Sequence, residues 1–239
     1  MTGQPSPFSP ELFDFFRDLD AHNEKEWFEA NRERYEEHVL EPSKVFVLAF
    51  RPRLREISPE FQAEPRVRGG SLFRIHTNRR FNPDRPPYKT HAGIQFRHRA
   101  GADVHTPGFY LHLEPEGGTQ GGEWGCFVGL GIWHPDRDAL TAIREAIVED
   151  PESWTAVTRE DDDFTSRFRL GGDSLARGPV GFDRDHPLID DITRKDFIAV
   201  ADLPEDEVVA DGFVERFADR CAAGAPFVRW LCQAVGVAF

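Results

Sequence analysis

The residues best suited to chemistry lie in one short segment, 74–90, which combines cations, a carboxylate, a phenol and several prolines. Arg74, Arg80 and Lys89 can converge on one anion, because guanidinium and ammonium groups bind carboxylate or phosphate oxygens, guanidinium in bidentate geometry. Adjacent prolines restrict the backbone and hold neighbouring side chains in place. The segment therefore predicts an anion-binding site.

Asp84 and Tyr88 add to the chemistry of this segment. Asp84 can orient one of the arginines or, if it is buried, serve as a general base. Tyr88 stands beside Lys89 and joins the expected ligand contacts. A structural interpretation competes with this one, since arginine–aspartate pairs and a tyrosine can tie a long turn to a sheet.

The segment is part of a basic region in an acidic chain. The 239 residues carry a net charge of −13, yet residues 51–100 hold 12 Lys and Arg against 4 Asp and Glu. The overall charge disfavours a general nucleic-acid-binding protein. One alternative is a module that binds nucleic acid or an acidic protein segment, with Phe73 and Phe81 exposed for stacking. Another is a structural protein whose polar motif only fixes the fold.

Helices are expected on both sides of this region, because apolar residues recur there at spacings of three and four. The pattern covers most of residues 10–60, 135–147 and 204–235. Asn23 with Glu26 predicts a capping box at the start of the second helix, and Pro42 predicts the first turn of the third, with Val45, Phe46, Leu48, Ala49 and Leu54 facing inward.

Strands are expected in the middle of the chain, where the pattern alternates between clusters of Gly, Pro and Asn. The predicted strands are 72–76, 92–97, 109–114 and 124–133, with shorter ones at 164–170 and 197–200. N-terminal helices, a central mostly antiparallel sheet and C-terminal helices predict an α+β fold. We expect a single domain over residues 1–239, with residues 1–9 as a flexible tail.

His112 and Arg144 are candidates for the same site as the segment 74–90. His112 alternates with Tyr110 on a predicted strand, so both side chains face one side of the sheet. His112 and Asp84 are therefore the candidate catalytic acid and base. Arg144 lies beside an apolar helix stripe and either extends to solvent or reaches inward to an anion.

The stretch from Gly129 to Trp133 offers a further contact. Its glycines predict close packing of a strand against another backbone or an aromatic ring, since no phosphate-loop motif accompanies them. Trp133 either packs in the core or covers a ligand.

No metal or cofactor site is predicted from local patterns. His91, His98, His105 and His112 recur every seven residues, a spacing without meaning in strands and loops, and no H-x-H or H-E-x-x-H motif is present. The three cysteines form no C-x-x-C pair, which favours a reducing, cytoplasmic location. No apolar run approaches the roughly 20 residues of a membrane span, so we expect no membrane partner.

The segment 74–90 resembles a bacterial and fungal family called domain of unknown function 2461, whose pattern is close to R-I-x-x-D-x-R-F-x-x-D-K-x-P-Y-K-T. The matching residues are Arg74, Ile75, Arg80, Phe81, Asp84, Pro87, Tyr88, Lys89 and Thr90. Similar stretches extend the resemblance over about residues 8–235. Asn78 and Arg85 depart from it, since the family has an acidic residue and a lysine there. The resemblance implies an α+β fold and no particular activity, and it favours Arg144 in the polar network of Arg74.

Together these patterns predict a basic pocket that binds a small phosphate- or carboxylate-bearing ligand. Its expected ligand contacts are Arg74, Arg80, Tyr88, Lys89, Arg144 and Trp133. If the protein is an enzyme, the expected reaction is transfer or hydrolysis on that ligand, with the cations stabilising developing negative charge.

Overall fold

A five-stranded antiparallel sheet forms the centre of the protein, with the strand order β1-β2-β3-β5-β4. The computed structural model describes residues 3–80, 82–101, 106–117 and 125–239. The strands are β1 (Ala92–Arg97), β2 (Gly108–Leu113), β3 (Phe127–Ile132), β4 (Arg169–Gly171) and β5 (Phe197–Asp202). Helices and an antiparallel sheet in one chain confirm the predicted α+β fold.

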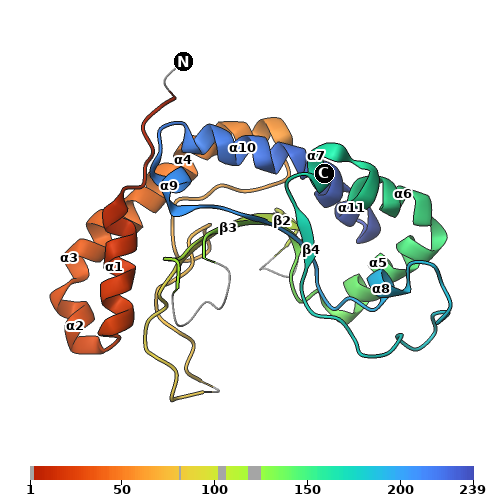
Figure 1. Ribbon diagram of the computed structural model, residues 1–239, viewed down its shortest axis with the longest axis horizontal. Coiled ribbons are helices and arrows are strands. Elements are labelled where there is room, and N and C mark those ends of the chain that lie inside the picture. The colour runs from red at the N-terminus through yellow and green to blue at the C-terminus, as the bar shows by residue number, and fades with distance from the viewer. Residues whose placement is uncertain (1–2, 81, 102–105, 118–124) are drawn as a thin grey trace.

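Helices precede the sheet in the chain, separate strands β3 and β5, and follow the last strand. The N-terminal group is α1 (Pro10–Ala21), α2 (Lys25–Ala30), α3 (Arg32–Tyr35), a π-helical turn (Glu36–Leu40) and α4 (Glu41–Ile57). The second group is α5 (Arg137–Glu149), α6 (Pro151–Thr155), a π-helical turn (Ala156–Glu160), α7 (Asp162–Thr165) and α8 (Ile189–Ile192). The last helices are α9 (Glu205–Val209), α10 (Phe213–Ala223) and α11 (Ala225–Ala234). Helices α4 and α10 lie along one face of the sheet, where α11 also packs on β3, and further helices stand at its two ends, which gives the molecule the form of an arch (Figure 1).

Successive side chains of each strand point to opposite faces of the sheet. One face packs in the hydrophobic core, and we call the other, which lines a cavity described below, the pocket face. On β2, Phe109, Leu111 and Leu113 are fully buried. The core face packs on aromatic rings of the covering helices, where Phe96 of β1 contacts Phe50 of α4 at a centroid distance of 4.7 Å. The alternate residues of the strands, among them Gln95, Tyr110 and His112, face the opposite side, as the sequence predicted.

Several sequence predictions about individual elements are wrong. Residues 72–76 form only isolated bridges, Leu72 with Ile94 and His76 with Tyr88, because the chain meets β1 and its own return segment at single points. Asn23 is not a helix cap, since α2 starts after Glu24 and has no side-chain cap bond.

Two further corrections concern helices and short strands. Pro42 does start α4, but Val45 and Leu48 are about half exposed rather than inward, and Ala49 is exposed as well. The strand expected over 164–170 is limited to β4, because Phe164 belongs to α7. The helical pattern over 204–222 is broken at Gly212, whose φ of 81° lies in the left-handed region that favours glycine.

The first described residues lie against the C-terminal helices. The Ser6 hydroxyl donates to the Val208 carbonyl, the Gly212 N–H donates to the Gln4 carbonyl, and Phe8 is buried. In the described part of the chain, every helix is too short or too polar to cross a membrane.

Candidate functional site

A cavity of about 400 Å³ opens on the pocket face of the sheet. Its volume lies in the range of about 300–1,000 Å³ that is typical of small-molecule sites. The walls are mainly apolar and aromatic, and a few polar groups face inward. The polar lining residues are Lys89, His91, Gln95, Tyr110 and His112, and the apolar ones include Phe73, Phe127, Trp133, Ile198 and Val200.

Glycines on the pocket face make room for this cavity. Gly129 and Gly131 of β3 line it, opposite Tyr110 and Gly108 of β2. A Cβ at Gly131 would lie 2.1 Å from the Phe197 carbonyl oxygen, and the residue has a φ of 104°. The predicted close packing of this glycine against a neighbouring backbone is therefore confirmed.

A chain of hydrogen bonds runs along strand β2 and just past its end. The Tyr110 hydroxyl is 3.0 Å from His112 Nδ1, and His112 Nε2 is 3.0 Å from Glu114 Oε2. These residues alternate with core residues, so all three side chains lie on one face. Glu114 is only 1% exposed, and the Thr90 hydroxyl donates to its second oxygen at 3.4 Å. Burial raises the pKa of Tyr110, so its hydroxyl keeps its proton at neutral pH.

His91 joins this chain from the start of the neighbouring strand. Its ring lies 4.4 Å from the His112 ring, centroid to centroid. Burial lowers the pKa of His91 to about 3, with the nearby His112 and Lys89 adding to the effect. Its imidazole is therefore neutral, and its buried Nδ1 has no hydrogen-bond partner in the part of the chain that the structure describes.

The geometry permits two kinds of chemistry. The chain from Tyr110 through His112 to Glu114 can move a proton between the cavity and a buried carboxylate. One nitrogen each from His91 and His112 and one oxygen from Glu114 also lie within 4.8 Å of one another, close enough to hold a metal ion. His91 and Glu114 belong to neither the predicted ligand contacts nor the predicted catalytic pair.

Lys89 is the cation that lines the cavity. Its Nζ lies 5.3 Å from the centre of the Phe73 ring. Burial and then the positive charge of Arg74 lower its pKa. Within the described residues, neither Lys89 nor Arg74 forms an ion pair with a carboxylate. Arg74 itself is exposed and lies outside the lining.

The other described residues of the segment 74–90 do not line the cavity. Arg80 and Asp84 are exposed, so the structure separates Asp84 from His112's buried hydrogen-bond chain. Tyr88 is buried against Phe28, with ring centroids 4.1 Å apart. Its ring is therefore part of the packing rather than of the cavity wall. Phe81, which the stacking alternative required, lies outside the described residues.

Trp133 and Arg144 have different surroundings. Trp133 lines the cavity at 51% exposure, next to His134 with ring centroids 4.0 Å apart. Arg144 is buried on α5 and donates to the Arg194 carbonyl at 2.8 Å. Burial lowers its pKa. Arg144 thus belongs to a contact between α5 and the segment after α8, and not to the cavity lining.

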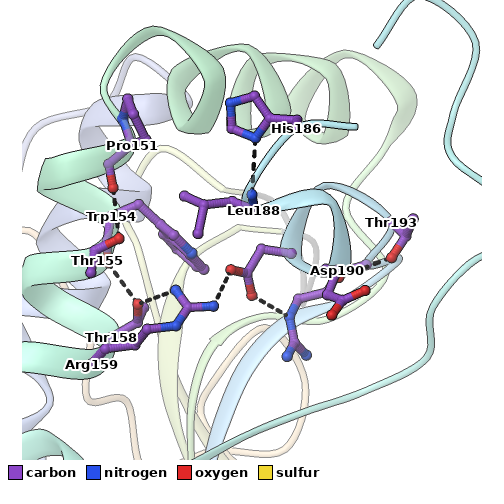
Figure 2. Close-up of polar contacts among 11 residues, drawn as sticks. Pro151, Trp154, Thr155, Thr158, Arg159, His186, Leu188, Asp190 and Thr193 are labelled. Atoms are coloured by element: carbon purple, nitrogen blue, oxygen red, sulfur yellow. Dashed lines mark hydrogen bonds and ion pairs between the residues drawn. The ribbon is translucent and has the colours of Figure 1, made fainter. Parts of the chain in front are cut away.

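The region around Arg194 is a separate polar cluster. Asp191 is buried and accepts hydrogen bonds from Arg159 at 2.6 Å and from Arg194 at 3.2 Å. Figure 2 shows Arg159 between the helical turn that carries Thr158 and this acidic group. One carboxylate pairs with both arginines, so the cluster joins the π-helical turn Ala156–Glu160 to α8 and the residues that follow it.

Fold and site together define an α+β protein with a small-molecule-sized cavity on the face of an antiparallel sheet opposite its core face. The family model described as conserved hypothetical protein (DUF2461) matches residues 11–230. The chain belongs to this family, which confirms the resemblance seen in its sequence. Comparisons with curated proteins and with solved structures gave no match.

Proposed function

We propose that the protein binds a small organic anion, with an apolar body and a carboxylate or phosphate group, in the cavity on the sheet. The observation that supports this most directly is Lys89, a half-buried ammonium group at the cavity wall without a carboxylate partner in the described residues. A cation removed from water is unfavourable unless an opposite charge pairs with it. An anionic ligand would supply that charge.

The lining favours a ligand whose remainder is apolar and flat. Phe73, Phe127 and Trp133 offer aromatic surfaces, and Ile198 and Val200 close the side formed by β5. The space above Gly129 and Gly131 gives a ring or chain direct access to the sheet. Lys89 would thus bind the charged group of the ligand, and the aromatic and aliphatic walls of the same cavity would bind its apolar part.

The proposal predicts a lysine-dependent thermal shift. Aromatic and aliphatic monocarboxylates and their phosphate analogues are added to the natural protein with a chelator present. A ligand at 100 times its Kd stabilises by about 2.7 kcal/mol, which raises the melting temperature of a chain of this size by about 5–10 °C. Lys89→Met should abolish that shift, while Lys25→Met, at an exposed position, should leave it intact.

The unliganded melting temperature separates this function from a purely structural role. Lys89→Met should change it little, because the methionine keeps the contact with Phe73 and removes a desolvated charge. A large loss of unliganded stability in Lys89→Met, or no shift of the natural protein with any of these anions, would contradict the proposal. An equal shift in Lys89→Met and the natural protein would also contradict it.

A further inference from the structure

Three metal-ligand side chains from two adjacent strands lie close together beside the cavity, and two of them, His91 and His112, line it. His91 precedes β1, His112 is in β2, and Glu114 follows β2. Since Ala92 pairs with Leu113, continuing the antiparallel register places His91 opposite Glu114. Their ligand atoms lie within 4.8 Å of one another, and His112 Nε2 is 3.0 Å from Glu114 Oε2.

These distances are close to those of a metal centre. Ligand bonds of about 2.0–2.2 Å around a tetrahedral ion place the ligand atoms about 3.4 Å apart. The His112–Glu114 pair, at 3.0 Å, is slightly closer than this distance. Since all ligand atoms lie within 4.8 Å of one another, His91 needs a movement of at most about 1.4 Å, and its side chain is only part-buried.

The hydrogen bonds around the three residues match those that orient metal ligands. A histidine ligand donates its second ring N–H to an oxygen, and a carboxylate ligand accepts a further hydrogen bond. His112 Nδ1 is 3.0 Å from the Tyr110 hydroxyl, and Glu114 Oε1 accepts from Thr90. His91 Nδ1 is buried without a partner among the described residues, so a lone pair is free to bind an ion.

We propose that His91, His112 and Glu114 bind a divalent transition-metal ion at the wall of the cavity. Two imidazoles and one carboxylate favour zinc or ferrous iron over magnesium and calcium, which prefer oxygen ligands. One carboxylate balances half of the ion's charge, and the remaining coordination positions face the cavity that His91 and His112 line. This site goes beyond the proposed anion binding and does not depend on it.

The sequence predicted no metal site because its ligands are not adjacent in the chain. His91 and His112 are separated by the whole of β1 and most of β2. Their approach depends on the register of this strand pair, which local motifs do not contain.

Metal binding is tested by titration of the full chain with metal ions alone. The protein is treated with a chelator, desalted, and titrated with Zn²⁺, with Co²⁺ as a spectroscopic probe and Mg²⁺ as a negative control. We expect one Zn²⁺ per chain, visible Co²⁺ absorption typical of nitrogen and oxygen ligands, and no Mg²⁺ binding. His91→Ala and Glu114→Gln should weaken Zn²⁺ binding by at least about 100-fold, and Tyr110→Phe by about tenfold.

His22→Ala is the matched control, because His22 is exposed and lies on a different part of the chain. It should bind Zn²⁺ as the natural protein does. His91→Ala removes no core side chain, so it remains informative if Glu114→Gln unfolds. Absence of stoichiometric Zn²⁺ binding, or binding that His91→Ala leaves unchanged, would overturn the proposed site. Since anion binding is measured in chelator, failure of either site is seen separately.

Discussion

Asn23 is expected to be a long-range anchor for the segment that carries Lys89. Its side-chain oxygen accepts from the Tyr88 N–H at 3.1 Å, and its side-chain nitrogen donates to the Tyr88 carbonyl at 2.9 Å. The segment 75–77 bonds to the residues on either side of Tyr88: the Lys89 N–H donates to the Ile75 carbonyl, and the Thr77 N–H donates to the Pro87 carbonyl. The N–H and the carbonyl of Tyr88 itself bond to Asn23 instead. The side-chain amide of Asn23 thus makes the two hydrogen bonds that a neighbouring strand would otherwise make with the Tyr88 backbone.

Asn23→Ala should therefore destabilise the protein strongly for a residue outside the core. Tyr88 is 3% exposed, so water has little access to its backbone groups. An unpaired buried donor or acceptor costs about 1–3 kcal/mol, and two of them with partial relaxation cost about 2–4 kcal/mol. For a chain of this length that corresponds to a decrease of about 5–15 °C in melting temperature.

Thermal and urea unfolding of the natural protein and the variant measure this loss. Asn31→Ala is the matched control, because the Asn31 side chain bonds only locally, to Trp27 and Arg34, and its loss should cost about 1 kcal/mol or less. Asn23→Ala should also weaken anion binding, since Lys89 follows the released residue. Equal stability of the two variants would refute the assigned role of Asn23.

Four further predictions concern two glycines of the sheet, the arginine cluster and the thiols. Gly131→Ala should destabilise the fold by several kcal/mol, because its Cβ would overlap a backbone carbonyl of β5, and circular dichroism melts would show it. Gly129→Ala should fold normally, since its Cβ meets only ordinary contacts, and should weaken ligand binding by occupying the cavity floor. Asp191→Asn should lower the unfolding free energy by about 2–4 kcal/mol in urea titrations, because it removes the charge between two arginines; an unchanged midpoint would contradict this. Burial raises the pKa of Cys126 and Cys232 to about 12 and that of Cys221 well above its usual value. At pH 8 a thiol reagent should therefore label none of the three thiols in native protein within minutes and all three in denaturant.

Two sequence patterns predicted most of the fold: the alternation of apolar and polar residues in strands, and the recurrence of apolar residues every three or four positions in helices. The pattern over 92–97 matches β1 at both ends, and the shared face of Tyr110 and His112 follows directly from the period of a strand. The segment 72–76 has the same kind of pattern, yet it forms only single bridges. Whether an extended segment finds a continuous partner depends on distant residues, which a local pattern does not contain.

The candidate site was only partly predictable for the same reason. Lys89, His112 and Trp133 were expected in a binding site and line the cavity. His91 and Glu114 were missed, because their position relative to His112 depends on the register of β1 on β2. The capping-box pattern at Asn23 was misleading, since its side chain bonds 65 residues away.

The division of strand β2 into two faces has a consequence for engineering. Even-numbered positions from 108 to 114 belong to the cavity side, and odd-numbered positions belong to the hydrophobic core. The even positions are not equally open to change, because a Cβ at Gly108 would lie 2.9 Å from the Phe96 carbonyl oxygen and Glu114 is 1% exposed. A library randomised at position 110 alone would change the cavity wall and leave the odd-numbered core positions intact. A single-residue insertion within the strand would reverse this parity and exchange the two sets of side chains, so it should disrupt the fold more than a substitution at position 110.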